Sequence, residues 1–379
     1  MLPLTPRNGY NPTLIFCGGQ VMNDADWGSY AYPNANVWTI GASADCQRIT
    51  PEPTDGSSPT YVQDDNLPVG RAMSQFIGLP DGTLLLLNGA QYGTAGYANQ
   101  TGNTPTLAQM PYGPSLATGP VLQPMIYNPN APSGSRWSTA GLGKSTIPRM
   151  YHSTALLLPD GSVMVAGSNP NADVNTTTTY PTTYTAEYFY PLYFSAKTRP
   201  APQNVPTTLS YGGKPFDITV PSSSYTGNAD GAAANTTVWV IRPGFTTHGM
   251  NMGQRMLQLN NTFTVASNGT ITLHTAQLPP SPSIFQPGPA LLFVTINGIP
   301  SNGTFVQVGS GKVEAQPTAA VSVLPASVNS GQNTNGKGNS TSNGNKNAAA
   351  SIPLYSVANG AGNIFISLGV VALTLALLS

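Results

Sequence analysis

Residues 149–167 read RMYHSTALLLPDGSVMVAG, and their central turn recurs in GLPDGTLLLLNG at residues 78–89. Each stretch places a tight Pro-Asp-Gly turn before a run of strand-forming apolar residues and a glycine-containing exit. Asp-Gly between two apolar runs is a strong signal for a β-hairpin. Two hairpins of one plan, about 70 to 80 residues apart, predict repeated units such as the blades of a kelch-type β-propeller. A plain β-sandwich is the alternative, although it would not need the repeat.

A third stretch, NPTLIFCGGQV at residues 11–21, is predicted to end another hairpin of this kind. Trp38 and Trp137 each follow the exit of a predicted hairpin, as aromatic residues do in kelch-type blades. The repeats are longer than the roughly 50 residues of a kelch unit, so we expect insertions in the loops.

The composition is that of an all-β protein with no nucleic-acid partner. The 379 residues include 40 Gly and 36 Pro, and no long segment before the C-terminus repeats apolar residues with a helical period. Charged residues make up 7% of the chain and the formal net charge is zero. Such a chain has no basic surface for phosphates.

The repeat pattern changes near residues 198–203, and alternating strands follow for about 110 residues at sandwich-like spacing. This spacing predicts an immunoglobulin-like domain after the blades. We expect four regions: blades over 1–198, an immunoglobulin-like β-sandwich over 199–312, a disordered Asn/Gly/Ser-rich linker over 313–351, and a hydrophobic tail over 352–379.

The two ends of the chain bear on its cellular location. The apolar tail from Ile364 to Leu378 is short for a membrane-spanning helix. Small residues, a spacer and this tail match a signal for a GPI anchor, which would tether the protein to the cell surface. A single C-terminal transmembrane helix is the alternative. The start of the chain lacks the pattern of a signal peptide, so we expect the true N-terminus to lie upstream.

Two further features fit a secreted protein. Cys17 and Cys46 are compatible with one disulfide or with two free thiols, and we favour the disulfide. Seven N-x-[ST] sequons predict a glycosylated surface: Asn99, Asn175, Asn235, Asn260, Asn268, Asn302 and Asn339.

Four motifs together resemble the galactose oxidase and glyoxal oxidase family of copper radical oxidases, with the fungal glyoxal oxidases most similar. They are RMYHSTALLLPDGSV, AEYFYPLYF, RPGFTTHGMNMGQR and PGPALLFVTINGIPS, and the likeness runs in order from about residue 10 to 309. The resemblance implies the late blades of a seven-bladed propeller, with one copper ion near its axis. It also implies a following immunoglobulin-like domain of the early-set type, one loop of which supplies a copper ligand.

Carried onto this chain, the resemblance implies that His152 and His248 are equatorial copper ligands. It implies that Tyr151 is the axial ligand and the catalytic base that takes the substrate proton. Independently, two neutral imidazoles with oxygen donors suit Cu(II). Copper also lowers the pKa of a bound phenol, so a tyrosine can act as a base near neutral pH.

Other residues near these motifs have simpler interpretations. We expect His274 to be structural, and Arg149 and Arg255 to brace strands rather than to bind substrate. Three methionines after His248 invite a thioether–copper interpretation, but packing at the domain interface is favoured: Met250, Met252 and Met256.

The sequence departs from the family in one respect. Family members carry a radical on a second tyrosine, which is thioether-bonded to a cysteine. In this chain Met73 stands where the comparable strand entry would have the tyrosine, and Cys17 is better paired with Cys46. The sequence therefore does not encode the cross-linked Cys-Tyr cofactor.

The resemblance implies oxidation of an aldehyde hydrate, such as that of glyoxal or methylglyoxal, or of a primary alcohol, with O2 reduced to H2O2. It suggests a monomer, with peroxide-consuming enzymes as potential partners. Two accounts of the departure remain open. The chain is either the C-terminal part of a longer oxidase, which we favour, or a non-catalytic surface-anchored wall- or carbohydrate-binding paralogue. In the favoured case we expect little oxidase activity and poor folding, because an open propeller exposes edge strands and apolar faces.

Overall fold

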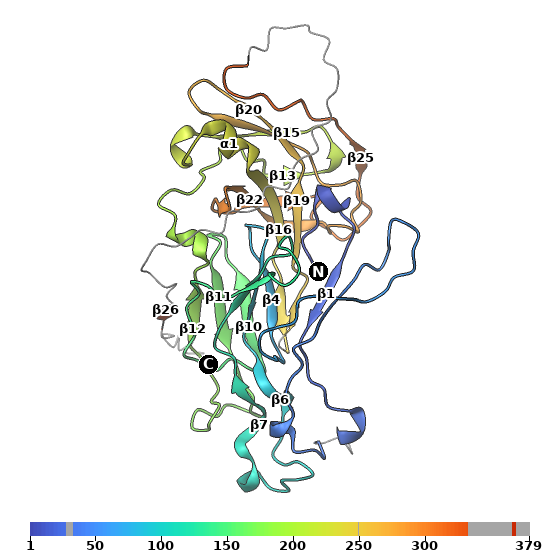
Figure 1. Cartoon of the computed structure of the whole chain (residues 1–379), viewed down its shortest axis with the longest axis vertical. Coiled ribbons are helices and arrows are strands. Elements are labelled where there is room, and N and C mark those ends of the chain that lie inside the picture. The colour runs from blue at the N-terminus through green and yellow to red at the C-terminus, as the bar shows by residue number, and fades with distance from the viewer. Residues whose placement is uncertain (28–32, 249, 333–365, 369–379) are drawn as a thin grey trace, which may run out of the picture.

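The computed structural model describes residues 1–27, 33–248, 250–332 and 366–368. These residues are nearly all β, as the sequence predicts, with α1 (Ala229–Ala234) as the one α-helix among them. Figure 1 shows small sheets from the N-terminal half at one end and a sandwich from the C-terminal half at the other. Short 3-10 turns connect the strands: Pro6–Asn8, Asp24–Trp27, Val37–Thr39, Leu107–Gln109, Leu192–Ser195 and Ser222–Ser224.

Three antiparallel sheets make up the blade-like end of the molecule. Apolar clusters join the first sheet to the second and the second to the third, so the sheets pack face to face. They do not close a ring among the described residues, and the propeller stays a prediction. The first sheet contains β1 (Leu14–Cys17), β2 (Cys46–Ile49) and β3 (Val62–Gln63), the second contains β4 (Gln75–Gly78), β5 (Leu84–Leu87), β8 (Met125–Tyr127) and β9 (Trp137–Ser138), and the third contains β10 (Ser153–Leu157), β11 (Val163–Gly167), β12 (Ala186–Phe189) and β26 (Ile366–Leu368).

The two Pro-Asp-Gly turns form the hairpins that the sequence predicts. They join β4 to β5 and β10 to β11 in antiparallel register. In the first turn Asp81 Oδ1 accepts hydrogen bonds from the backbone N–H and the hydroxyl of Thr83, and in the second Asp160 does the same with Ser162. The aspartate therefore closes each turn over its own following residue, which explains why the motif recurs.

The third predicted hairpin is wrong in its pairing. β1 pairs with β2, the strand that follows it, and no strand before it completes a hairpin in the described part of the chain. The preceding segment instead crosses to the sandwich, where Leu4 forms a parallel bridge with Leu257. Leu4 is fully buried there, and the gain from burying this side chain explains the different pairing.

A long hairpin extends the second sheet at its lower end in Figure 1. It consists of β6 (Ala90–Tyr97) and β7 (Pro111–Pro120), which pair antiparallel with one irregularity. Trp38 packs beside it and donates a hydrogen bond of 2.8 Å from Nε1 to the Ser115 carbonyl. This hairpin brings Tyr97 toward the start of β10.

The C-terminal half folds as two layers of sheet, in agreement with the predicted immunoglobulin-like domain. The six-stranded layer contains β13 (Thr208–Leu209), β24 (Thr304–Val308), β22 (Gly288–Ile296), β16 (Thr236–Arg242) and β19 (Arg255–Leu259), with β23 (Ile299–Pro300) on β22; the three-stranded layer contains β15 (Phe216–Val220), β21 (Ile271–Thr275) and β20 (Asn261–Val265). One apolar cluster from both layers fills the space between them. A separate hairpin, β17 (Phe245–Thr247) with β18 (Met250–Met252), projects from the sandwich toward the blades.

The two halves share one apolar core rather than a polar seam. Trp239 and Phe293 of the sandwich lie in the same cluster as Ile77 and Val163 of the blades. Both Pro-Asp-Gly turns touch the sandwich: the Thr295 hydroxyl donates to the carbonyl of Pro80, and Arg199 Nη2 donates to that of Asp160. A shared core with direct turn contacts predicts that the halves move as one body.

The sandwich extends beyond its expected end. β25 (Thr318–Val321) pairs in parallel with β14 (Tyr211–Gly213), and Val328 bridges Thr264. Both the amide and the hydroxyl of Ser330 donate to Asp230. The disordered linker predicted from residue 313 is therefore wrong up to about residue 332, because this segment finds hydrogen-bonding partners along the edge of the sandwich.

Several sequence predictions fall on residues outside the described part of the chain. They include the rest of the linker to 351, most of the tail, the GPI signal and the Asn339 sequon. Ile366–Leu368 forms β26 on the edge of β12. Among the described residues, no helix is long and apolar enough to cross a membrane.

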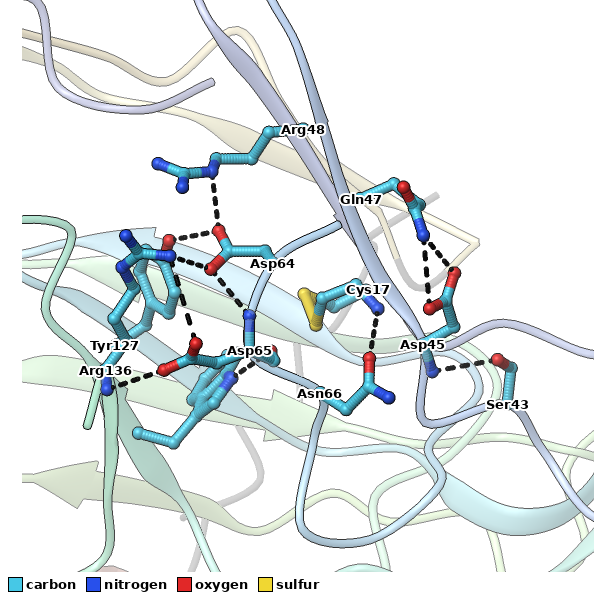
Figure 2. Close-up of a disulfide and its surroundings, with 12 residues drawn as sticks. Cys17, Ser43, Asp45, Gln47, Arg48, Asp64, Asp65, Asn66, Tyr127 and Arg136 are labelled. Carbon is cyan, nitrogen blue, oxygen red and sulfur yellow. Dashed lines mark hydrogen bonds and ion pairs between the residues drawn. A yellow bond between two sulfur atoms is a disulfide. The ribbon is translucent and has the colours of Figure 1, made fainter. Parts of the chain in front are cut away.

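The cysteine pairing favoured from the sequence is present. Cys17 and Cys46 lie directly opposite each other in β1 and β2 and form a disulfide, shown in Figure 2. No free cysteine remains, because the chain has only these two.

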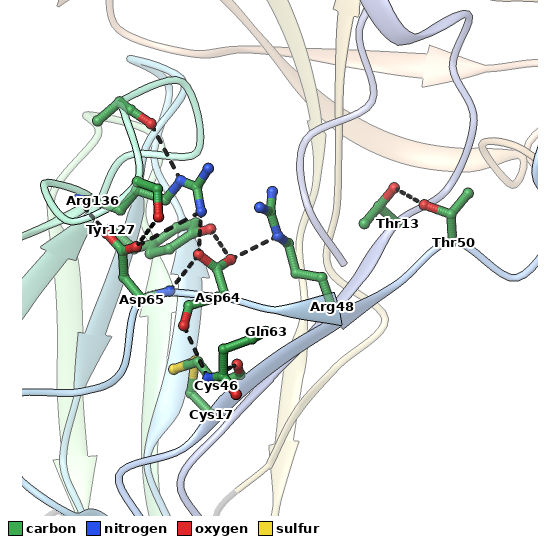
Figure 3. Close-up of polar contacts among 12 residues, drawn as sticks. Thr13, Cys17, Cys46, Arg48, Thr50, Gln63, Asp64, Asp65, Tyr127 and Arg136 are labelled. Carbon is green, nitrogen blue, oxygen red and sulfur yellow. Dashed lines mark hydrogen bonds and ion pairs between the residues drawn. A yellow bond between two sulfur atoms is a disulfide. The ribbon is translucent and has the colours of Figure 1, made fainter. Parts of the chain in front are cut away.

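Beside the disulfide, a buried carboxylate links the first sheet to the second (Figure 3). The Asp64 side chain is fully buried and accepts from Arg48 Nε at 2.8 Å, from Arg136 Nη1 and from the Tyr127 hydroxyl. Burial alone would raise its pKa, but hydrogen bonds from Tyr127, from the Asp65 amide and from Arg136, with the nearby charge of Arg48, lower it. Arg136 and Tyr127 come from the second sheet, so the ionised carboxylate fastens the two sheets together.

We expect Asp64→Ala to lower the free energy of unfolding by about 3 kcal/mol at pH 7, because it leaves two arginines without their buried partner. A carboxylate with a depressed folded pKa contributes stability above its unfolded pKa and loses it as the pH falls through the folded pKa. The difference between wild type and variant should therefore be full at pH 6–7 and shrink below about pH 4. Urea unfolding at several pH values measures this. Asp45→Ala, which removes an exposed carboxylate near the same sheet, is the control; an equal loss there would refute the special role of Asp64.

Candidate metal centre

Tyr151 and His152 lie in the turn that leads into β10. The Tyr151 carbonyl accepts from the Asn169 amide at 2.8 Å, and His152 Nδ1 lies 3.0 Å from the Asn169 carbonyl. Since a carbonyl only accepts, Nδ1 of His152 carries the proton. Its Nε2 lone pair is left free for a ligand, an arrangement typical of metal-binding histidines.

A buried ion pair holds this turn in place. Arg149 donates from Nε to Glu187 Oε2 at 2.8 Å, and both side chains are 1% exposed. Arg149 also donates to the carbonyls of Gly167 and Thr185. The bracing role expected for Arg149 is therefore the one that the structure shows. Arg255 likewise donates to two backbone carbonyls, those of Ser283 and Ile284.

His248 reaches the same place from the other half of the molecule. It follows β17 at the turn of the β17–β18 hairpin, and its Nδ1 lies 2.6 Å from the Thr247 hydroxyl. Two residues of the RPGFTTHGMNMGQR motif, Asn251 and Gln254, fasten the hairpin to β4. Asn251 Nδ2 donates to the Phe76 carbonyl at 2.9 Å, and Gln254 Oε1 accepts from the Gly78 amide at 2.9 Å.

The three aromatic rings converge. The ring centroids of Tyr151 and His152 are 3.9 Å apart, those of His152 and His248 are 5.2 Å apart, and those of Tyr151 and His248 are 5.8 Å apart. Both histidines have left-handed backbone, with φ of 61° for His152 and 53° for His248. Such conformations cost free energy in non-glycine residues and are concentrated at functional sites.

A fourth ring, which the sequence did not point to, borders the group. Tyr97 of β6 lies 6.4 Å from the rings of both Tyr151 and His152, measured between centroids. Burial raises the pKa of Tyr151, and the electrostatic interaction with Tyr97 raises it further by a smaller amount. Without a metal, the Tyr151 phenol is therefore protonated at neutral pH. The sequence could not indicate Tyr97, because the long β6–β7 hairpin alone brings it to this position.

These residues fit a copper ion by the chemistry of their donors. Two imidazoles have Nδ1 engaged in hydrogen bonds and Nε2 available, and a phenol oxygen stands beside them. Nitrogen and oxygen donors of this kind suit Cu(II), which accepts a weaker axial ligand. In the described residues no three His, Cys, Asp or Glu side chains gather to hold a metal. The site therefore depends on its tyrosine as the third donor.

The remaining candidates lie elsewhere. His274 sits on the sandwich face between Asp217 and Thr264, with hydrogen bonds of 2.8 and 2.9 Å, which agrees with its expected structural role. Met256 packs in the shared core at 5% exposure, as expected. Met250 and Met252 are 61% and 41% exposed, so the expectation that they pack at the interface is wrong.

The sequon asparagines lie on the surface of the described chain. Five are exposed and Asn175 is half-buried. Glycosylation at these positions is not tested by the fold and stays a prediction. The five exposed residues are Asn99, Asn235, Asn260, Asn268 and Asn302.

Comparison with known proteins identifies the family of the chain. The glyoxal oxidase N-terminus model matches residues 1–193, and the galactose oxidase-like early set domain matches residues 199–308. The chain belongs to the glyoxal oxidase family. The aldehyde oxidase GLOX1 of Arabidopsis thaliana is 34% identical over 79% of this chain and 45% of its own length. The galactose oxidase of Gibberella zeae is 28% identical over 77% of this chain and 38% of its own length.

A solved structure shares the fold. A fungal alcohol oxidase, described as a complex with copper, superposes with a TM-score of 0.52 at 21% identity, covering 77% of this chain and 54% of its own. The chain spans less than half the length of the two curated relatives above.

We expect Gln254→Ala to loosen the β17–β18 hairpin, because the Gly78 amide then loses its acceptor. Amide hydrogen exchange in residues 245–252 should become faster. Cu(II) affinity should fall about tenfold, the usual effect of losing a residue that supports a metal ligand. Gln47→Ala, in a hydrogen-bond network of the first sheet, is the matched control. Unchanged exchange in the hairpin of the Gln254 variant would contradict this anchoring role.

Proposed function

We propose that this chain is the copper-binding, C-terminal part of a glyoxal oxidase-like copper radical oxidase. Its reaction would oxidise aldehyde hydrates, or primary alcohols, with O2 and release H2O2. The observation that carries the proposal is the convergence of Tyr151, His152 and His248 from two halves of the chain. The relatives named as aldehyde oxidases support aldehydes as the substrate class.

In this proposal His152 and His248 hold the copper through Nε2, and Tyr151 contributes its phenol oxygen. Bound copper would supply an electron acceptor and would lower the pKa of the phenol, which the protein alone raises. Tyr151 then takes the hydroxyl proton of the substrate at its phenol oxygen. Asn169 keeps the His152 ring oriented, and the Tyr97 ring borders the site on one side.

The radical cofactor is a separate matter. Cys17 and Cys46 are bound to each other, so neither is free to form a thioether with a tyrosine. The second redox-active tyrosine and its cysteine would therefore come from polypeptide beyond this sequence. The same observation favours a second candidate, a non-catalytic surface or wall-binding protein that keeps the fold without the radical.

For location, we propose an extracellular protein held at the cell surface by a GPI anchor. The disulfide belongs to an oxidising compartment. The accessible sequon asparagines are compatible with glycosylation.

Cu(II) titration of the 379-residue chain, followed by electron paramagnetic resonance, tests the site. We expect one Cu(II) with nitrogen hyperfine structure, and affinity at least about tenfold lower in His152→Ala and His248→Ala, since each loses a direct ligand. His274→Ala should bind as wild type does. A wild-type chain without nitrogen-ligated Cu(II), or an equal loss in His274→Ala, would refute the proposal.

We also expect no H2O2 above background from this chain with methylglyoxal, because the radical pair is not encoded. A coupled peroxidase assay on copper-loaded protein measures it. Peroxide formation that Tyr151→Phe abolishes would show that the chain is catalytic alone, and the cofactor argument would then be wrong.

A further inference from the structure

The segment that follows β11 holds the turn with Tyr151 and His152 through three successive hydrogen bonds. Ser168 Oγ accepts from the Met150 amide at 3.0 Å. The Asn169 amide donates to the Tyr151 carbonyl at 2.8 Å, and the Asn169 carbonyl lies 3.0 Å from Nδ1 of His152. The position of Asn169 therefore decides how the His152 ring is oriented and which of its nitrogens is left for a ligand.

The side chain of Asn169 is itself held in place, chiefly by Asn171. Oδ1 of Asn169 accepts from the Asn171 amide at 3.3 Å, from Asn171 Nδ2 at 3.1 Å and from the Thr182 hydroxyl at 2.9 Å. Asn171 Nδ2 also donates to the Tyr180 carbonyl at 3.2 Å, and the Tyr180 hydroxyl lies 2.7 Å from the Thr118 hydroxyl in β7. Asn171 thus joins Asn169 to a segment that is tied to the β6–β7 hairpin.

Asn171 is 2% exposed, and its contacts require an amide group. Both groups that its Nδ2 binds, Oδ1 of Asn169 and the Tyr180 carbonyl, are acceptors only. Turning the Asn171 amide over would place an oxygen against these two oxygens, so its orientation is fixed. The side chain makes no other hydrogen bond in the described chain, since its Oδ1 finds no donor. The two donated bonds, rather than the volume of the side chain, therefore account for an asparagine at this position.

We propose that Asn171 is a positioning residue for the candidate metal centre, because it fixes Asn169 and thereby the orientation and the tautomer of His152. The inference rests on the proposed copper site and adds to it a residue that touches no ligand directly. In a neutral imidazole the hydrogen bond of one nitrogen decides which nitrogen carries the proton. With the Asn169 carbonyl fixed at Nδ1, Nε2 is available to a metal. With Asn169 free to move, the proton can shift from Nδ1 to Nε2, and Nε2 then has no lone pair to offer.

The ring tautomers of the full chain without copper test this role. The sequence has three histidines, so 15N-labelled histidine gives few signals, and the His152→Ala spectrum assigns those of His152. Long-range 1H–15N correlation spectra at pH 8 distinguish a ring protonated on Nδ1 from one protonated on Nε2. In wild type the proton of His152 should be on Nδ1. In Asn171→Ala, which lacks both side-chain bonds, a second population protonated on Nε2 should be present.

Cu(II) binding gives a second measurement on the same variants. Cu(II) affinity should fall about tenfold in Asn171→Ala, the usual effect of losing a residue that supports a metal ligand. Thr182→Val removes the other side-chain donor to Asn169 Oδ1 and should act in the same direction, whereas Thr182→Ser should behave as wild type. This pair keeps the test valid if Asn171→Ala does not fold. Asn128→Ala is the control, because Asn128 shapes a loop of the second sheet by accepting from the Asn130 amide.

The two measurements separate this inference from the proposed function. If the His152 tautomer and the Cu(II) affinity are those of wild type in Asn171→Ala, or in Thr182→Val where the former does not fold, the positioning role is refuted even where wild type binds Cu(II). An equal change in Asn128→Ala would show a general loosening of the fold and would also refute it. If the tautomer changes but wild type binds no nitrogen-ligated Cu(II), the positioning of His152 stands and the proposed oxidase centre fails.

Discussion

The candidate site depends on the docking of one hairpin against the backbone of one strand. Asn251 and Gln254 bind the Phe76 carbonyl and the Gly78 amide of β4, and so place His248 beside His152, 96 residues earlier in the chain. Backbone groups in an ordered strand are fixed acceptors and donors, so the hairpin has little freedom to shift. The same RPGFTTHGMNMGQR motif therefore supplies both a candidate metal ligand and the means of positioning it.

That docking works because the two halves of the molecule do not move independently. Trp239 of the sandwich packs in one apolar core with blade residues, and it also covers the first Pro-Asp-Gly turn, where a Cβ on Gly82 would lie 3.2 Å from its ring. Gly82 has a φ of 91°, so a side chain there would be both strained and crowded. Each Pro-Asp-Gly turn thus forms its own hairpin and is also part of the interface with the sandwich.

The sequence predicted the elements that depend on residues close together in the chain. Asp-Gly turns and alternating apolar residues specified the hairpins and the sandwich strands, and the motifs around Tyr151 and His248 pointed to their partnership through resemblance. Long-range pairing could not be read in this way. The short segment that forms β25 reads TAAV, which has no alternation of apolar and polar residues; it is exposed and is held by backbone partners on β14. Tyr97 and the exposure of Met250 likewise follow from tertiary placement.

The two Pro-Asp-Gly hairpins differ in how their first strands are braced, and only the second carries residues of the candidate metal centre. Arg71 and Arg149 precede the two hairpins one residue out of step with each other, and each donates from Nη2 to a carbonyl at matching places, Gln123 and Thr185. Arg149 also forms the ion pair with Glu187. In the other sheet Met125 stands at the position of Glu187, so Arg71 has no such carboxylate. Arg71 Nε and Nη1 find no acceptor in the described chain. Burial consequently lowers the pKa of Arg71 to about 10. The complete set of contacts is found in the sheet whose turn carries Tyr151 and His152, and a fixed backbone is what the proposed metal centre requires there.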